Sequence, residues 1–83
     1  MRMFSVYDSK AEAYGTPVFF KTKGEALRSF TDIVNDGTSM LSKYPGDYTL
    51  FELGVFDDEN ANFELHSTPI SLGVALEFVK SLS

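Results

Sequence analysis

Apolar and polar residues alternate at the start of the chain and predict a β-hairpin. In residues 2–7 the alternation places Phe4 and Val6 together on one face of a strand. A polar stretch then leads to a second apolar segment, residues 17–21. Pro17 at its first position suits the start of an edge strand, because proline cannot donate a hydrogen bond to the sheet. We therefore expect these two segments to pair.

A second pair of alternating segments lies in the other half of the chain. Residues 48–56 are rich in aromatic and aliphatic side chains, and the turn-forming residues 57–62 lead back into residues 63–66. Pro45 and Gly46, just before them, predict a type II turn, which needs a positive φ at its glycine. These features predict a second hairpin.

Residues 22–34 have the pattern of an amphipathic helix. Thr22 and Glu25 match a capping box, in which the threonine oxygen accepts a hydrogen bond from the amide three residues on. Apolar residues then recur at the spacing that one buried helix face requires. They are Ala26, Leu27, Phe30, Ile33 and Val34. Residues 35–37 (NDG) predict a left-handed stop to this helix.

The end of the chain predicts a second helix. Thr68 is a capping residue, and Pro69 follows it at the position where proline is favoured in the first helical turn. A helix is therefore expected from about Pro69 to Leu82. One apolar stripe of this helix would face the core.

A second apolar stripe on this last helix has more than one interpretation. It consists of Val74, Phe78 and Leu82. It could contact a protein partner, including a second copy of the chain, or it could be covered by residues 8–14. Alternatively, Gly73 and the β-branched residues make this segment a strand.

Together these elements predict one α+β domain over residues 1–83. The predicted order is ββαββα, with an antiparallel-rich sheet and both helices on one face. The composition fits a single core, since 43% of the 83 residues are hydrophobic and 14% are aromatic.

The composition also indicates where the protein acts. The chain has no cysteine, which excludes disulfides and fits a reducing compartment. No run approaches the roughly 18 apolar residues that a membrane span needs, and the start of the chain lacks the apolar stretch of a signal peptide. We therefore expect a cytoplasmic protein without membrane contact.

Charge is distributed unevenly along the chain. Residues 1–44 hold six Lys and Arg against five Asp and Glu, for a net charge of +1, whereas residues 45–83 hold one against seven, for −6. Nucleic-acid binding draws much of its free energy from Lys and Arg on phosphates. Any nucleic-acid contact is therefore expected in the first half of the chain.

No group of residues predicts catalysis or cofactor binding. His66 is the only histidine, and no nucleophile motif accompanies it. The six glycines lie singly, so no glycine-rich phosphate loop occurs. We expect no catalytic residue, no metal site and no cofactor.

Two kinds of binding surface remain. The acidic turn Asp57, Asp58 and Glu59, with the second apolar stripe, is the candidate surface for a protein partner. The alternative is direct binding of single-stranded DNA by a cluster of cations with neighbouring aromatic residues. The cations are Arg2, Lys21, Lys23 and Arg28, and the aromatic residues are Tyr7, Phe19 and Phe20.

Several stretches, taken in order, resemble the small nonstructural protein of the gokushovirus branch of microviruses. They are residues 4–11 (FSVYDSKA), 17–20 (PVFF), 26–32 (ALRSFTD), 35–36 (ND), 43–48 (KYPGDY), 50–54 (LFELG), 56–58 (FDD) and 71–73 (SLG). These stretches cover nearly the whole chain. The chain departs from the family pattern at Gly46, where Glu is commoner.

The resemblance implies a function rather than a chemistry. It implies a protein of single-stranded DNA phages that is absent from the virion and is the counterpart of the microvirus protein C. A protein of this kind would act as an adaptor. It would bind phage or host replication proteins, or the procapsid, in the host cytoplasm and promote the switch to single-stranded viral DNA synthesis and packaging. A scaffold-like assembly factor is a further possibility. The family has no catalytic residues to transfer.

Overall fold

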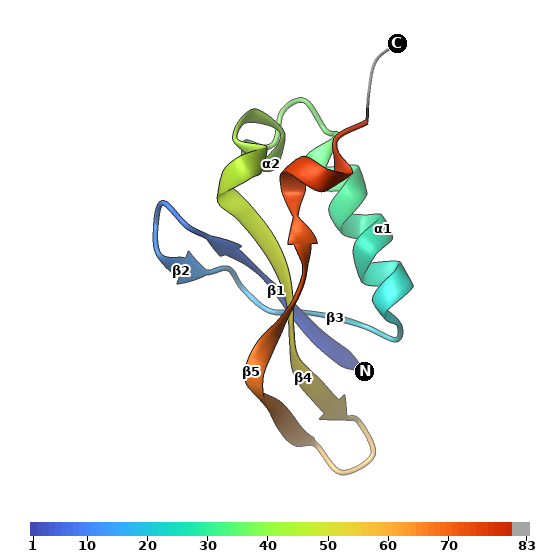
Figure 1. Cartoon of the computed structure of the whole chain (residues 1–83). Coiled ribbons are helices and arrows are strands. Elements are labelled where there is room, and N and C mark those ends of the chain that lie inside the picture. The colour runs from blue at the N-terminus through green and yellow to red at the C-terminus, as the bar shows by residue number, and fades with distance from the viewer. Residues whose placement is uncertain (81–83) are drawn as a thin grey trace.

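One antiparallel sheet organises the chain, of which the computed structural model describes residues 1–80 (Figure 1). Its strands are β1 (Arg2–Asp8), β2 (Ala13–Tyr14), β3 (Val18–Phe20), β4 (Tyr48–Asp57) and β5 (Asn62–Val74). The short strands β2 and β3 pair with β1, β4 pairs with β1, and β5 pairs with β4. Both predicted hairpins are therefore confirmed.

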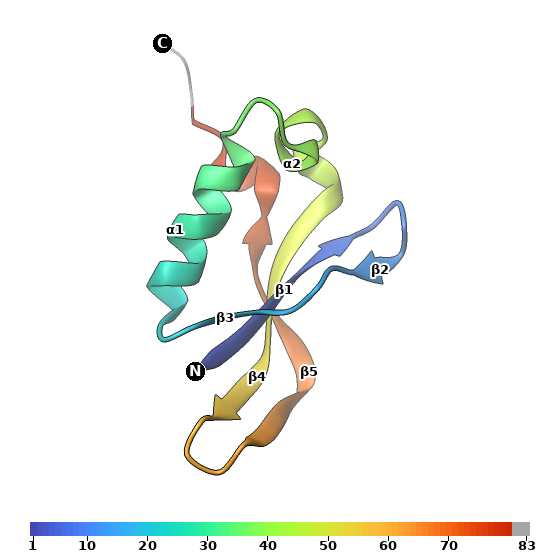
Figure 2. The ribbon, with the colours of Figure 1, turned by 180° about the vertical axis from the view of Figure 1, so that it is seen from behind.

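Helical segments are α1 (Lys23–Val34), α2 (Met40–Lys43) and two 3₁₀ turns, η1 (Pro45–Asp47) and η2 (Ala75–Phe78). The long helix α1 lies against one face of the sheet, and the view from behind shows that the far end of the β4–β5 hairpin extends away from it (Figure 2). An α+β fold is thus confirmed, but the order ββαββα is only partly matched.

The predicted helix α1 forms where the sequence pattern places it. The Thr22 hydroxyl oxygen accepts a hydrogen bond from the amide of Glu25 at 3.2 Å, as a capping box requires. The helix ends at Val34, but the predicted left-handed stop is wrong, because none of residues 35–37 has a positive φ. Instead, the side-chain amide of Asn35 donates a hydrogen bond to the carbonyl oxygen of Thr31 at 2.8 Å and satisfies this acceptor in the last turn.

The core lies between α1 and the sheet. Its buried residues are Phe4, Ala26, Phe30, Val34, Leu50 and Ala75. The apolar stripe of α1 supplies three of them, while β1 and β4 supply Phe4 and Leu50. Phe78 of η2 closes the core, with its ring 5.5 Å from that of Phe30 in an edge-on contact.

The helix predicted from Pro69 to Leu82 is wrong over its described part. Residues up to Val74 belong to β5, which pairs with β4, and only the single turn η2 follows. Gly73 has a φ of 139°, which is incompatible with a helix and is open only to glycine. The strand that was left open as an alternative is therefore the one observed, and it replaces the second helix expected on the face that α1 covers.

Two β-bulges explain how this strand accommodates its sequence. Glu52 pairs with Ile70, but Gly54 pairs with Leu65, so residues 66–69 lie opposite Leu53 alone. Pro69 lies in this irregular segment, where the missing N–H costs no regular sheet bond. A second shift, between Leu50 and Phe51, accommodates the residues around Gly73.

The connector before β4 also differs from expectation. No type II turn forms, because Gly73 is the only glycine with a positive φ among residues 1–80. The amide of Asp47 donates to the carbonyl oxygen of Tyr44 at 3.0 Å and closes the 3₁₀ turn η1. This turn delivers Tyr48 into the first position of β4.

The molecule is elongated, with extents of 47 × 25 × 18 Å. The far end of the β4–β5 hairpin, residues 54–65, projects beyond the helix and the rest of the sheet (Figure 1). We call this segment the arm. It is the part of the fold that extends farthest from the core.

Candidate protein-binding surface

The face of the sheet opposite α1 carries aromatic side chains, and we call it the open face. Neighbouring residues of a strand point to opposite faces. Since Val6, Phe20 and Leu50 pack in the core, Tyr7, Phe19 and Phe51 lie on the open face.

These aromatic residues form two groups. Tyr7 contacts Tyr14 at 4.8 Å between ring centroids, and Phe51 contacts both rings, at 6.3 and 5.6 Å. The second group follows β4 into the arm, where Phe56 lies 5.9 Å from Phe19 and 4.8 Å from Phe63.

A bulge in β4 places the second group on the open face. Regular alternation would put Phe51 and Phe56 on opposite faces, because they are an odd number of residues apart. The register shifts at Leu53, since Met3 pairs with Gly54 and Phe4 with Glu52. The shift restores Phe56 to the face that carries Phe19.

The arm exposes much of its apolar surface. Phe63 is 61% exposed and Leu65 is 67% exposed, the two highest values among the large apolar residues of the described chain. Contiguous exposed apolar residues on a small protein typically mark a contact site. Neither residue was in the predicted protein-binding set, because the short pattern at residues 63–66 indicated a strand but not which face would stay open.

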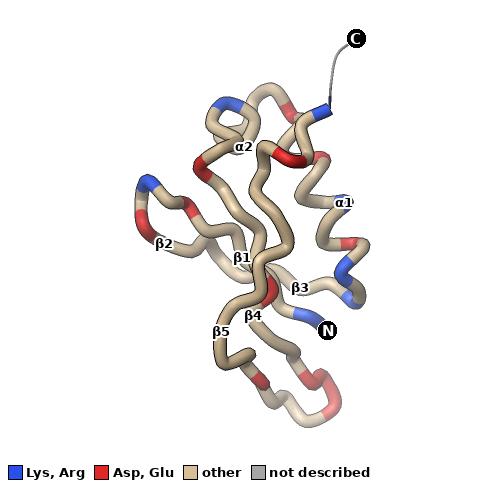
Figure 3. Tube along the Cα trace, viewed as in Figure 1, with Lys and Arg blue, Asp and Glu red and all other residues tan. Residues whose placement is uncertain are grey.

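The predicted acidic turn lies at the end of the arm, where Asp57, Asp58 and Glu59 are all exposed (Figure 3). Asp57 orders the turn, because its Oδ2 accepts from the Asn60 side chain at 2.9 Å and its Oδ1 from the Glu59 amide at 3.0 Å. These bonds hold the pKa of Asp57 below its ordinary value, and the bond from the Asn60 side chain has the largest effect. The turn is therefore a fixed negative group at neutral pH.

The predicted cationic residues lie elsewhere. Lys21 and Lys23 flank the cap of α1, and Arg28 lies farther along the same helix, all exposed. Of the aromatic residues proposed to accompany them, Phe20 packs against the core, whereas Tyr7 and Phe19 lie on the open face. Lys23 and Arg28 thus belong to the helix that covers the other face of the sheet, away from Tyr7 and Phe19.

Arg2, the fourth predicted cation, takes part in a small charged group. The Arg2 guanidinium lies 3.4 Å from one oxygen of Glu52, and the His66 ring nitrogen Nε2 lies 2.7 Å from the other. Glu52 is buried, and each of its two carboxylate oxygens has one of these partners in place of water. His66 belongs to the bulged segment of β5, so the contact fixes the base of the arm.

The predicted second apolar stripe does not form a continuous surface. Val74 ends β5 and is half-buried, and Phe78 packs into the core against Phe30. Leu82 lies outside the described residues. Of the predicted protein-binding set, only the acidic turn belongs to the exposed arm.

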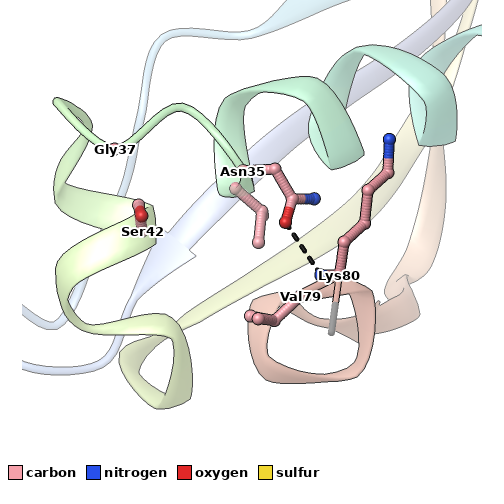
Figure 4. Close-up of a pocket in the computed structure, with 6 residues that line it drawn as sticks. Asn35, Gly37, Ser42, Val79 and Lys80 are labelled. Atoms are coloured by element: carbon pink, nitrogen blue, oxygen red, sulfur yellow. Dashed lines mark hydrogen bonds between the residues drawn. The ribbon is translucent and has the colours of Figure 1, made fainter. Parts of the chain in front are cut away.

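A groove lies where the end of α1, the segment with Gly37 and Ser42, and residues 79–80 meet (Figure 4). Its volume is about 430 Å³. Asn35 spans it: its side-chain amide donates to the carbonyl oxygen of Phe78 at 3.0 Å, and its side-chain oxygen accepts from the amide of Lys80 at 2.8 Å. The groove therefore lies at a structural junction that holds η2 against α1.

The described residues contain no helix with the length and apolar character needed to cross a membrane.

Comparison with known proteins gives two related matches. A family model described as "Phage ORF5 protein" matches residues 1–78. The chain is also similar to "Protein ORF5" of Chlamydia phage 1, with 35% identity over 78 residues that cover 89% of this chain and 77% of the relative. No solved structure matches the chain.

Proposed function

This chain belongs to the Phage ORF5 protein family, and from that premise we propose that it is an adaptor that binds a protein partner through the arm. The partner is a phage or host replication protein or a procapsid component. Binding promotes the switch to single-stranded viral DNA synthesis and packaging. The membership itself identifies a small phage protein of the microvirus type.

The exposed apolar surface of the arm carries this proposal. Protein interfaces combine buried aromatic and aliphatic anchors with a charged rim. Phe63 and Leu65 supply the anchors, and the acidic turn Asp57, Asp58 and Glu59 supplies the rim. The arm also projects from the fold, so a large partner can reach it without contact with α1.

In this proposal the protein acts by binding and not by catalysis. Its effect on DNA synthesis comes from the complex that it joins. The core side chains around Phe30 hold the scaffold, and the arm presents the contact surface.

Photo-crosslinking in infected cells tests the adaptor function. A photoreactive phenylalanine analogue at position 63 should crosslink to one replication or capsid protein, because that side chain is central to the proposed contact. The matched control is the same analogue at Met40, which is also exposed but lies on α2. Equal labelling from both positions, or none from position 63, would contradict the proposal.

The role in DNA synthesis needs a separate measurement. A phage that encodes Phe63→Ser with Leu65→Ser should accumulate duplex viral DNA and lose single-stranded genomes, as quantified by hybridisation. A phage with Met40→Ser should retain the normal ratio. A normal ratio in both phages would contradict the proposed role of the arm in the switch, even if crosslinking identifies a partner.

A further inference from the structure

The outer edge of β5 presents free backbone hydrogen-bonding groups at the arm. Met1 and Phe56 exchange two bonds: the Phe56 amide donates to the Met1 carbonyl oxygen at 2.7 Å, and the Met1 ammonium donates to the Phe56 carbonyl oxygen at 3.0 Å. Both backbone groups of Phe56 thus point toward the β1 side. Phe63, opposite Phe56, must then direct its own N–H and C=O away from β4.

The same orientation recurs two residues along β5. Leu65 pairs with Gly54, which itself faces Met3 of β1. Leu65 therefore also directs its N–H and C=O outward. Among residues 1–80, no strand pairs with this edge of β5. The edge of residues 63–65 offers two donors and two acceptors to another chain.

Side chains on this edge select what can pair with it. The exposed side chains of Phe63 and Leu65 lie on the open face, and the exposed Glu64 between them points to the other face. A strand added here would place alternate residues beside Phe63 and Leu65, where apolar residues fit. The residue between them would lie beside Glu64, where a cation fits.

Charge distinguishes between possible occupants. Residues 44–79 contain no Lys or Arg, and the arm carries Asp57, Asp58, Glu59 and Glu64. A second copy of the arm would bring the same negative charges together, and a nucleic acid would add phosphates. A cationic polypeptide is the occupant that this surface attracts.

We propose that the edge of residues 63–65 accepts an extended segment of a protein partner, in which apolar residues alternate with Lys or Arg, as an added strand of the sheet. This inference rests on the proposed adaptor function and specifies the partner's chemistry. The added strand is short, because the turn ends the edge on one side and the bulge with Pro69 ends it on the other. Backbone bonds supply the docking, and the alternation supplies the selectivity.

Synthetic peptides test the proposal with the full chain. The probe is a short fluorescein-labelled peptide in which Val alternates with Lys, titrated by fluorescence anisotropy. It should bind, and it should slow hydrogen exchange at the amides of Phe63 and Leu65. Three control peptides should bind at least about tenfold more weakly. One has Glu in place of Lys, one has the same residues in two blocks, and one is N-methylated along the edge that forms the bonds.

A proline variant separates backbone pairing from side-chain contact. Leu65→Pro removes an outward N–H that makes no bond to β4, so the hairpin should persist. It should weaken peptide binding about tenfold beyond the effect of Leu65→Ala, which keeps the N–H. Two-dimensional NMR verifies that both variants fold. If Leu65→Pro does not fold, the N-methylated peptide decides the question.

Several outcomes would overturn the inference. Equal binding of the N-methylated peptide would rule out strand addition, and equal binding of the Glu peptide would rule out the cationic partner. A concentration-dependent dimer that Leu65→Pro abolishes would identify a second copy as the occupant. Displacement of the peptide by single-stranded DNA at this edge would identify nucleic acid as the occupant. In each case a specific crosslink from position 63 in infected cells would leave the adaptor function standing.

Discussion

Gly54 shows how one residue controls the geometry of the arm. It lies where β4 resumes its pairing with β5 after the bulge, opposite Leu65. A Cβ at this position would collide with the carbonyl oxygen of Glu64 and lie 2.8 Å from the Cα of Leu65. Both are backbone atoms and cannot turn aside. The close approach of the two strands therefore requires glycine here.

We expect Gly54→Ala to reduce the free energy of unfolding by about 1 to 3 kcal/mol, the usual cost of overpacking. Urea denaturation followed by circular dichroism measures the change. Gly37→Ala is the matched control, because a Cβ at Gly37 meets no atom within 4 Å. Equal stability of the two variants would show that β5 does not approach β4 this closely.

A second single residue, Asp57, makes the stability of the fold depend on pH. The hydrogen bond from the Asn60 side chain is the largest cause of its lowered pKa, and backbone amides and the N-terminal charge add to it. A folded-state pKa below the unfolded value means that the ionised carboxylate favours folding. This contribution is complete above the unfolded pKa of about 3.9 and is lost as the pH falls through the folded value.

We expect Asn60→Ala to raise the pKa of Asp57 toward its ordinary value, because its strongest hydrogen-bond donor is gone. An NMR titration of the Asp57 side-chain carboxyl carbon follows this change directly. The carboxyl carbon of Asp36, whose pKa is lowered by hydrogen bonds from Thr38, serves as the internal control and should not move. A titration of Asp57 unaltered by Asn60→Ala would contradict the role assigned to that bond.

At the scale of elements, local sequence patterns predicted the first half of the fold better than the second. The cap at Thr22 and the apolar spacing of α1 are local signals, and both hold. The segment after Pro69 carries both helix and strand signals, and pairing with β4 decides between them. Such pairing depends on residues far away in the sequence and on bulges that no short window contains.

Substitution of Phe78, in the turn that follows β5, tests whether this residue packs in the core or in an interface. We expect Phe78→Ala to reduce the free energy of unfolding by about 2 to 4 kcal/mol, because the half-buried ring packs on Phe30. Leu76→Ala in the same turn should change it little, since Leu76 is exposed. Chemical denaturation at two protein concentrations measures both. A midpoint that rises with protein concentration in the native chain, and not in Phe78→Ala, would instead place Phe78 in an interface.

At the scale of the whole molecule, the end of the arm carries carboxylates alone, whereas both signs of charge occur over the rest of the fold (Figure 3). Cations gather around the start of α1, and carboxylates gather at the end of the arm. The sequence predicted this division, because the two halves of the chain differ in charge. It did not predict the aromatic group that ends at Phe63, because that group depends on the bulge at Leu53.

This division predicts weak binding of single-stranded DNA. Titration of a fluorescent oligonucleotide at about 50 and about 200 mM salt should give low affinity, since Lys23 and Arg28 lie on α1, which covers the face of the sheet opposite Tyr7 and Phe19. Lys23→Glu with Arg28→Glu should then change little. Tight, strongly salt-dependent binding that this double variant abolishes would instead support the DNA-binding function.

Pro69 has a consequence for the behaviour of the protein at high concentration. A long, flat, unprotected strand at the border of a sheet invites end-to-end stacking of molecules into fibres. Here the irregular residues 66–69 break the border of β5 into short pieces, and the proline offers no amide to an incoming neighbour. This border thus leaves room for the one short added strand that we propose, whereas it interrupts the continuous row of backbone groups that open-ended stacking of molecules requires.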